Sequence, residues 1–413
     1  MLKKEELAIE LIEKLSDFST LDYSEDILNR LEVLLSDFII CVVSANCKSN
    51  SQSLLAHDGA VGLAARLASQ SAFEDKDDLD WSAVNHPGSV VFATSLATSI
   101  SHSRFRSNFV VSALAGMRAS ASIAHFFGTS HRKRWHITAT AGTFGAAAAA
   151  AAGIGLDKTK TRNAFHLAGA NMGGIGQVSL ELQGKPRFNR ASAAALGLMA
   201  AAGAFENIPT VTNLWTGSRG LIEIFDIEAV ITENHLIKNG IQSVRVRTFP
   251  ASGFIQSAIL GVSQLSKENS GSLKNLIVEI NTGVYSILSD SNKDRWWNLQ
   301  LNTAAAWASK DPMILTPAPE FEKFVTVVGS DIPLGSARIT GSTTKGDFEL
   351  YVSDAPGLEL FNSTEISWRQ RKWSSMVGSE WEIIAQLAHE IVKGKIDEIG
   401  WSQLERFLKS TQK

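Results

Sequence analysis

Apolar residues recur at helical spacing through the first half of the chain. Leu7, Leu11 and Leu15 follow one another at intervals of four, which predicts an amphipathic helix near the N-terminus. Further helical patterns occupy residues 31–42, 54–68, 90–100, 109–127, 161–170 and 191–205. Because no stretch here alternates convincingly as a strand does, the pattern predicts an all-helical body.

The pattern changes near residue 243. Alternation predicts strands at residues 243–248, 276–282, 323–328, 336–341 and 347–352, the last two flanking a hairpin turn at 343–346. Helical spacing returns at 365–376, 380–392 and 401–408. We therefore predict a mainly α protein: a large all-helical domain, residues 1–232 and 371–413, with an inserted smaller α+β lid domain, residues 233–370.

One segment, residues 135–156, is almost without large side chains. Seven consecutive alanines at 146–152 predict a helix. Since that helix is apolar on every side, we expect it in the interior with other helices packed all around it. Gly142 and Gly145 allow another backbone or a ligand to approach its first turn.

The start of this helix is a candidate anion site. Thr140 and Thr143 are plausible N-cap residues, and the unpaired N–H groups of a first turn attract a carboxylate. His136 lies just before it. The alternative is a tightly packed core helix preceded by a loop histidine with a local hydrogen bond.

Composition narrows the class of protein. The 413 residues allow two domains, and with 44% hydrophobic residues a large core is expected. The net charge of −3, from 39 basic and 42 acidic residues, argues against a nucleic-acid or membrane partner. Cys41 and Cys47 form no disulfide framework, and no signal peptide or membrane span is apparent. A cytoplasmic protein is therefore expected.

His86 precedes Pro87 and Gly88 at the end of an acidic loop, residues 71–85. Because proline disfavours helix at the residue before it, His86 is expected in a fixed loop, where it could act as a general base. A local capping role is the alternative. The acidic loop itself is expected to be solvated surface, or else to supply a carboxylate that orients His86. No ligand spacing supports a metal site.

Several cations are candidates for binding carboxylates. Lys185, in a glycine-containing loop, could hold a carboxylate or protonate a leaving group, or simply be exposed. Arg245 and Arg247 face the same side of one predicted strand, where solvent is the expected partner and a carboxylate the alternative. The basic loop at 131–134 is expected to be solvated. The glycine-rich residues 169–176 lack a dinucleotide-binding pattern.

These segments share an order with a known family. They are His86-Pro87-Gly88-Ser89, the Trp135-His136 stretch that leads through Gly145 into the alanines, residues 164–175, and Lys185-Pro186, with weaker support from residues 247–250 and 345–346. In these features the chain resembles the MmgE/PrpD family, which includes 2-methylcitrate dehydratase, cis-aconitate decarboxylase and iminodisuccinate epimerase. The resemblance spans nearly the whole chain.

The resemblance implies a helical body with an α+β lid, usually as a homodimer, without metal or organic cofactor. It implies a small di- or tricarboxylate as substrate and places His86, His136 and Lys185 in the active-site cleft as catalytic residues. Arg247 stands where relatives commonly have a lysine. The expected substrate-binding residues are Arg247, Asp78, Asp80 and Thr138.

The leading hypothesis is a cofactor-independent lyase, a dehydratase or decarboxylase, that removes a proton next to a carboxylate. An epimerase or isomerase using the same cleft is the first alternative. The second is a non-catalytic carboxylate-binding paralogue. It is motivated by residues 77–81, where relatives carry an Asp-Asp-Thr-His-like motif, and by residues 299–303, which lack the usual tyrosine.

Overall fold

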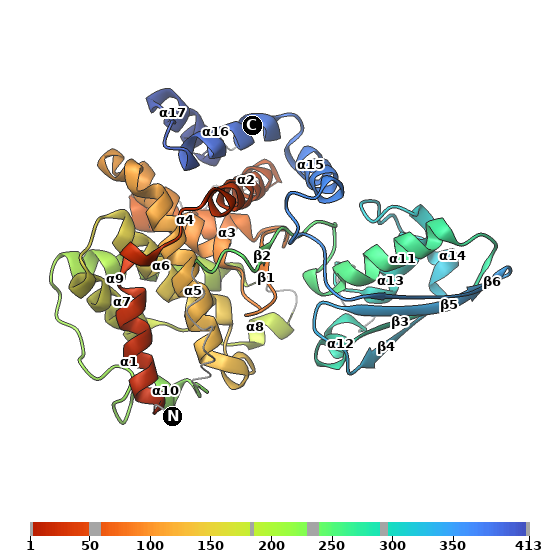
Figure 1. Cartoon of the computed structure of the whole chain (residues 1–413), viewed down its shortest axis with the longest axis horizontal. Helices are drawn as coiled ribbons and strands as arrows, with labels where there is room; N and C mark the ends of the chain where they lie inside the picture. The colour runs from red at the N-terminus through yellow and green to blue at the C-terminus, as the bar shows by residue number, and fades with distance from the viewer. Residues whose placement is uncertain (1–2, 49–58, 182–185, 229–238, 290–295, 410–413) are drawn as a thin grey trace. The chain divides into compact units, whose positions relative to one another are not determined.

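The computed structural model describes residues 3–48, 59–181, 186–228, 239–289 and 296–409. Helices predominate over small sheets (Figure 1), so the predicted mainly α class is confirmed. The chain forms two compact units, Met1–Val244 with Met376–Lys413, and Arg245–Ser375. The sequence pattern places its domain boundaries after residues 232 and 370.

The first unit is built from helices, with one two-residue strand, β1 (Leu79–Asp80), before α4. Its α-helices are α1 (Lys4–Leu15), α2 (Glu25–Lys48), α3 (Ala60–Ser71), α4 (Pro87–Ser101), α5 (Phe109–Arg132), α6 (Ile137–Gly153), α7 (Lys158–Asn171), α8 (Gln177–Leu180), α9 (Arg187–Phe205), α10 (Leu221–Ile224), α16 (Glu380–Val392) and α17 (Glu398–Lys409). Short 3₁₀ turns, η1 (Phe18–Thr20) and η2 (Ser103–Asn108), precede α2 and α5.

The stretch Ser103–Arg132, which comprises η2 and α5, has the length and apolar composition of a membrane span. However, 83% of its most apolar part is buried within the structure. Buried core helices of soluble proteins meet the same criterion, so this feature is only weak support for a span.

Helix α6 lies at the centre of the first unit. The helices α4, α5, α7 and α9 all contact it, and every residue from Ile137 to Gly153 is buried. A helix of alanine, glycine and threonine has no polar face to present to water, so it is stable only when neighbours cover every side. The predicted interior helix is therefore confirmed.

Two neighbouring helices approach α6 through glycines. A Cβ atom added at Gly145 would lie 3.1 Å from the backbone oxygen of Gly116 in α5. One added at Gly197 in α9 would lie 2.3 Å from the Cβ of Ala146 and 2.6 Å from the backbone nitrogen of Ala147. The prediction of close backbone approach at Gly145 is thus confirmed, whereas Gly142 faces the side chain of Val90.

The predicted N-caps of α6 are wrong. The helix begins at Ile137, earlier than expected, so Thr140 and Thr143 lie inside it and His136 is the N-cap residue. Both hydroxyls bond back to preceding carbonyls, Thr143 Oγ1 to the oxygen of Ala139 at 2.7 Å and Thr140 Oγ1 to that of Ile137 at 3.4 Å. The threonines satisfy their hydroxyls within the helix and therefore tolerate burial.

The second unit contains a four-stranded sheet in the order β4-β3-β5-β6. Its strands are β3 (Leu273–Asn281), β4 (Val325–Ser330), β5 (Ala337–Thr343) and β6 (Gly346–Val352), and its helical segments are η4 (Gly253–Ile255), α11 (Gln256–Glu268), α12 (Thr282–Leu288), α13 (Leu299–Ser309), α14 (Pro319–Glu322) and most of α15 (Ser363–Val377). β3 runs parallel to β4 and antiparallel to β5. The hairpin expected at 343–346 joins β5 and β6, since Thr343 pairs with Gly346.

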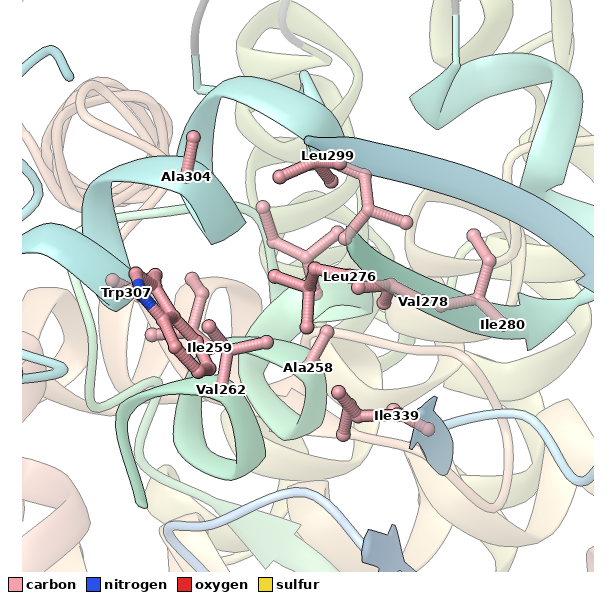
Figure 2. Packing of buried hydrophobic residues seen from close by; sticks show 14 of the residues in the cluster. Ala258, Ile259, Val262, Leu276, Val278, Ile280, Leu299, Ala304, Trp307 and Ile339 are labelled. Carbon is pink, nitrogen blue, oxygen red and sulfur yellow. The ribbon is translucent and has the colours of Figure 1, made fainter. Parts of the chain in front are cut away.

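One face of this sheet carries the core of the second unit. Leu276 and Val278 of β3 are fully buried, whereas Ile277 between them is 37% exposed. Figure 2 shows Val262 of α11 and Trp307 of α13 in the same apolar cluster as these strand residues. The alternation that predicts β3 from the sequence therefore reflects one helix-covered face.

The strand predicted at 243–248 is mostly wrong. Only β2 (Val244–Arg245), at the boundary between the units, is strand. Beyond it the backbone nitrogen of Val246 bonds to the oxygen of Gly357 at 3.0 Å, in an irregular segment. Alternation alone does not ensure that a partner strand is available.

Replacing Gly197 with alanine tests the close packing on α6. The added methyl meets backbone atoms that cannot move aside, so we expect a loss of about 1–3 kcal/mol in the free energy of unfolding. This loss occurs although alanine favours helix by about 1 kcal/mol over glycine. Urea unfolding followed by circular dichroism measures it.

Gly203→Ala, in the same helix, is the matched control. Its added methyl would meet only the side chains of Leu167 and Ile208, at 3.1 and 3.3 Å from their nearest atoms, and these can adjust. It should change stability much less than Gly197→Ala. Equal effects of the two substitutions would contradict backbone contact as the constraint.

Candidate active site

His86 is the N-cap residue of α4 and has non-helical φ and ψ values of −119° and 71°. This agrees with the effect expected of Pro87 on the preceding residue. The backbone nitrogen of His86 donates to Thr138 Oγ1 in α6 at 3.2 Å, and its oxygen accepts from Ser89 Oγ at 2.8 Å. Thr138 therefore links the start of α4 to the start of α6.

The imidazole of His86 has a defined tautomer. Its Nδ1 lies 2.6 Å from the backbone oxygen of Asp78 and 3.6 Å from Oδ2 of Asp77. A carbonyl oxygen can only accept, so Nδ1 carries the proton and Nε2 is the basic nitrogen of the neutral ring. The ring is 16% exposed, which leaves it partly accessible.

The acidic loop before His86 is not solvated surface, contrary to the favoured expectation. Asp75, Asp77, Asp78 and Asp80 are all less than 9% exposed. Asp77 forms an ion pair with Arg190 of α9, and each of these side chains is only 1% exposed. Burial of the loop is possible because its carboxylates meet a buried cation and backbone N–H groups.

Asp78 caps the first turn of α4. Its Oδ2 accepts from the backbone nitrogen of Gly88 at 2.8 Å. Burial, together with the neighbouring charge of Asp77, raises the pKa of Asp78 to about 7, although the Gly88 hydrogen bond and Arg190 act in the opposite direction. Asp78 is thus partly protonated near neutral pH.

The side chain of Asp80 forms hydrogen bonds within its own turn. Its Oδ1 accepts from the backbone nitrogen of Ser82 at 3.0 Å and from Ser82 Oγ at 2.6 Å. The backbone groups of Asp80 and Asn85 also bond to each other, which closes the loop directly before His86. The hydrogen bonds of Asp80 therefore support the shape of the loop, and its predicted contact with substrate stays a prediction.

His136 is buried at the start of α6, with 7% of its surface exposed. Its backbone nitrogen donates to the oxygen of Gly174 at 2.9 Å. Burial lowers the pKa of the His136 ring to about 3, and the positive charge of Arg190 contributes in the same direction. The ring is therefore neutral at physiological pH.

Several buried polar atoms in this region have no hydrogen-bond partner among the described residues. They include Oδ1 of Asp77, Nδ1 of His136 and Nε of Arg190. An unsatisfied buried polar atom costs about 1–3 kcal/mol, so a group of them is typical of a site that completes its hydrogen bonds with a ligand or water.

The first turns of three helices meet here. His86 begins α4, His136 begins α6, and Arg190 lies in the first turn of α9. Contacts join them, since His86 bonds to Thr138 and Asp77 lies against both His86 and Arg190. Helix N-termini carry partial positive charge, so this arrangement favours an anion.

The predicted carboxylate-binding cations are not part of this cluster among the described residues. Lys185 lies outside the described residues, so its predicted role stays a prediction. Arg247 belongs to the second unit, where it is 4% exposed. Its neighbour Arg245 is also buried, at 6%, and pairs with Asp354 at 2.9 Å. The favoured expectation of solvent around these two arginines is therefore wrong, and Arg245 meets a carboxylate instead.

The basic loop at 131–134 is also only partly solvated. His131 belongs to α5 and is fully buried, with Nδ1 2.9 Å from the oxygen of Phe225 and Nε2 2.8 Å from Thr140 Oγ1. Burial lowers the pKa of His131 to about 4. Lys133 and Arg134 are exposed, as expected.

In the described ranges no group of three or more His, Cys, Asp or Glu side chains could hold a metal ion. Two cavities in the same ranges are lined by neither His86 nor His136. One, of about 170 Å³, is lined by residues such as Thr98, Ile154 and Leu198, and the other lies along α16 and α17.

Sequence reasoning missed Arg190 and the pairing of Asp77. A signal was present, because Arg190 directly precedes an alanine-rich helix that is predicted to be buried. A cation at such a position needs a buried carboxylate partner. The partner could not be named, since Asp77 lies 113 positions away in the chain.

Taken together, these features define a mainly helical protein with a buried imidazole–carboxylate site at converging helix starts. Residues 60–232 match the family model described as the MmgE/PrpD N-terminal domain, and this match supports membership of the chain in the MmgE/PrpD family. The matched region contains His86, His136, Asp77 and Arg190. The family suggests a dehydratase-like enzyme. No curated protein matches the chain.

Because His136 is buried as a neutral ring, we expect the free energy of unfolding to depend on pH. Its pKa is about 3 in the folded state and near 6.5 when unfolded, so below pH 6.5 only the unfolded state binds this proton. The contribution of the neutral His136 ring to the free energy of unfolding is fully present above pH 6.5. Below pH 6.5 it decreases by about 1.4 kcal/mol per pH unit. Asp78 has the opposite effect, because its pKa is raised in the folded state. Its contribution to the free energy of unfolding increases as the pH falls from about 7 to about 4.

His136→Asn removes the titrating ring and keeps a residue that caps helices well. Relative to this variant, the wild type should lose about 1.4 kcal/mol per pH unit between pH 6.5 and 4.5. Urea unfolding of both proteins across this range measures the difference. A difference that does not depend on pH would show that His136 is not buried as a neutral ring.

Proposed function

We propose that this protein is a cofactor-independent lyase, a dehydratase or decarboxylase, that acts on a small di- or tricarboxylate. The observation that carries this proposal is the pair of imidazoles in one buried cluster: His86 has its Nδ1 proton engaged, and Nδ1 of His136 has no hydrogen-bond partner among the described residues. Membership in the MmgE/PrpD family supports the same reaction class.

His86 is the proposed base. With Nδ1–H donated to the oxygen of Asp78, its Nε2 takes the proton from the carbon next to a substrate carboxylate. The Asp77 carboxylate, 3.6 Å from Nδ1, stabilises the imidazolium that forms. In a dehydration the electrons of the broken C–H bond form the C=C bond while the C–O bond on the adjacent carbon breaks.

The converging helix starts supply the anion binding. Charge builds up on the substrate carboxylate as the proton leaves, and the first turns of α4, α6 and α9 place positive dipole ends nearby. The charge of Asp77 is balanced by Arg190, and Asp78 is partly protonated near neutral pH, so the acidic loop does not exclude an anionic ligand.

His136 is proposed to act as a neutral hydrogen-bonding group. Because its ring does not become charged at physiological pH, it can donate or accept a hydrogen bond at the leaving oxygen or the carboxylate without adding charge. The proton that turns the leaving hydroxide into water is assigned to Lys185, on the resemblance alone. Carboxylate binding by Arg247 is proposed on the same basis.

An epimerase is the second candidate. Two imidazoles that belong to different helices could serve opposite faces of one carbon, one removing the proton and the other returning it. The two reactions differ in outcome, since a lyase releases water or CO₂ and an epimerase returns the substrate with its stereochemistry changed.

Incubation of the protein with a panel of di- and tricarboxylates in D₂O, followed by NMR, tests the proposed reaction. A lyase gives a new alkene signal or loss of CO₂, whereas an epimerase gives deuterium in recovered substrate. His86→Gln should lower turnover by at least about 100-fold, since a positioned base contributes 10²–10⁴-fold. Binding of a carboxylate without any conversion would favour a non-catalytic protein.

His102→Gln is the matched control, because His102 is the exposed C-cap residue at the other end of the same helix, α4. It should leave turnover unchanged. If His86→Gln retains the wild-type rate while folded, the assignment of His86 as base is wrong.

The raised pKa of Asp78 predicts a pH dependence of substrate binding. Above about pH 7 the ionised Asp78 adds a negative charge to a site for an anion, so KM should rise, by about tenfold for a coupling of one pKa unit. Asp78→Asn imitates the neutral carboxyl group and should flatten this rise. Steady-state kinetics from pH 6 to 8.5 on both proteins measures it, and an equally steep rise in the variant would assign the effect to another group.

A further inference from the structure

Arg190 is buried deep in the first unit although it carries a permanent charge. It lies in the first turn of α9, with 1% of its side chain exposed. The residues that follow it on α9 are mostly alanine, glycine and leucine. A charge in such surroundings is costly unless it is paired, so its partners indicate what it does.

The first partner connects Arg190 to His86. Oδ2 of Asp77 contacts Nη1 of Arg190 and lies 3.6 Å from Nδ1 of His86. One carboxylate oxygen thus serves both the guanidinium and the imidazole. Asp77 is 1% exposed, so water does not screen either interaction strongly.

The second neighbour is His136. Burial is the main cause that lowers the pKa of the His136 ring, and the charge of Arg190 adds to it. Nδ1 of His136 and Nε of Arg190 have no hydrogen-bond partner in the described part of the chain. Two like charges in a water-poor site repel strongly, so the guanidinium opposes an imidazolium at His136.

We propose that Arg190 is a positioning residue for His86: it holds the Asp77 carboxylate, whose Oδ2 contacts both groups, and so sets the charge that the His86 imidazole faces. This inference rests on the proposed function for its chemical purpose, and on contacts within the first unit for its geometry. Arg190 touches no reacting atom in this proposal.

Other charged groups face the same cluster and have to be considered. They are Asp78 from the loop before α4, which lies next to Asp77, and Asp37 from α2, which acts on Asp78. The charge of Arg190 also lowers the pKa of Asp78. The expected signs are therefore judged by comparing Asp77→Asn with Arg190→Gln.

The test follows proton binding directly, by NMR titration of protein labelled with ¹⁵N in histidine rings and ¹³C in aspartate carboxyl groups. Asp77→Asn removes a negative charge near His86, so the titration midpoint of His86 should fall. Arg190→Gln leaves the Asp77 carboxylate unbalanced, so the Asp77–His86 pair should bind its proton at higher pH. Each shift should be at least about one pH unit, as for charges within 4–6 Å.

Arg187→Gln is the matched control. Arg187 lies one turn earlier on α9, donates to the oxygen of Ser69 at 3.0 Å and stacks over Phe73, away from Asp77. It should leave both histidine midpoints unchanged. Arg190→Lys keeps the charge, so it should restore most of the wild-type midpoints even though it loses the planar guanidinium.

In catalysis, the acid limb of the kcat profile should move to higher pH in Arg190→Gln and to lower pH in Asp77→Asn, with smaller changes in KM. If Arg190→Gln does not fold, Arg190→Lys and Asp77→Asn still decide the question. Unchanged midpoints in folded Asp77→Asn, or a shift in Arg187→Gln equal to that in Arg190→Gln, would overturn the proposal.

The titrations also separate this inference from the proposed function. If the midpoints shift as expected but no carboxylate is converted, the positioning role stands and the lyase assignment fails. If substrate is converted and the midpoints do not move, the lyase assignment stands and the role of Arg190 fails.

Discussion

The rest of the first unit depends on backbone packing against α6. Gly116 of α5 and Gly197 of α9 approach this helix so closely that a methyl group at either position would lie less than 3 Å from a backbone atom of α6. Dispersion contacts at such short range need complementary surfaces, and a helix of alanine and glycine supplies a smooth one. The position of α6 is therefore fixed by its neighbours along its length.

This packing also fixes the site. His136 and Thr138 occupy the start of α6, Arg190 the start of α9, and His86 the start of α4, which also contacts α6. Tightly packed helices hold their termini in place, so the polar groups keep their geometry although several of them lack hydrogen-bond partners within the described ranges. The packing of the apolar core thus offsets the unfavourable burial of these polar groups, as is common at functional sites.

The sequence predicts the helices of the body, the interior helix and the hairpin because these follow from local spacing, whereas His86 and His136 are grouped only by the family resemblance. It does not predict the buried ion pair of Asp77 and Arg190, since attraction between residues 113 positions apart leaves no local pattern. For the same reason the acidic loop is expected in solvent. The N-caps at Thr140 and Thr143 fail for another reason: helix boundaries depend on tertiary contacts, here between His136 and Gly174.

The two imidazoles show how one residue type acquires two chemical characters from its surroundings. His86 is partly exposed, with Nδ1 3.6 Å from the Asp77 carboxylate, whereas burial lowers the pKa of His136 to about 3, with a smaller contribution from Arg190. Acid–base catalysis needs groups whose proton affinities differ, because a base that is already protonated cannot accept a proton and an acid that has lost its proton cannot give one. The Asp77–Arg190 ion pair sets the charge next to His86, whereas burial, with a smaller contribution from Arg190, keeps His136 neutral. The different surroundings of the two rings are therefore as important to the proposed chemistry as the rings themselves.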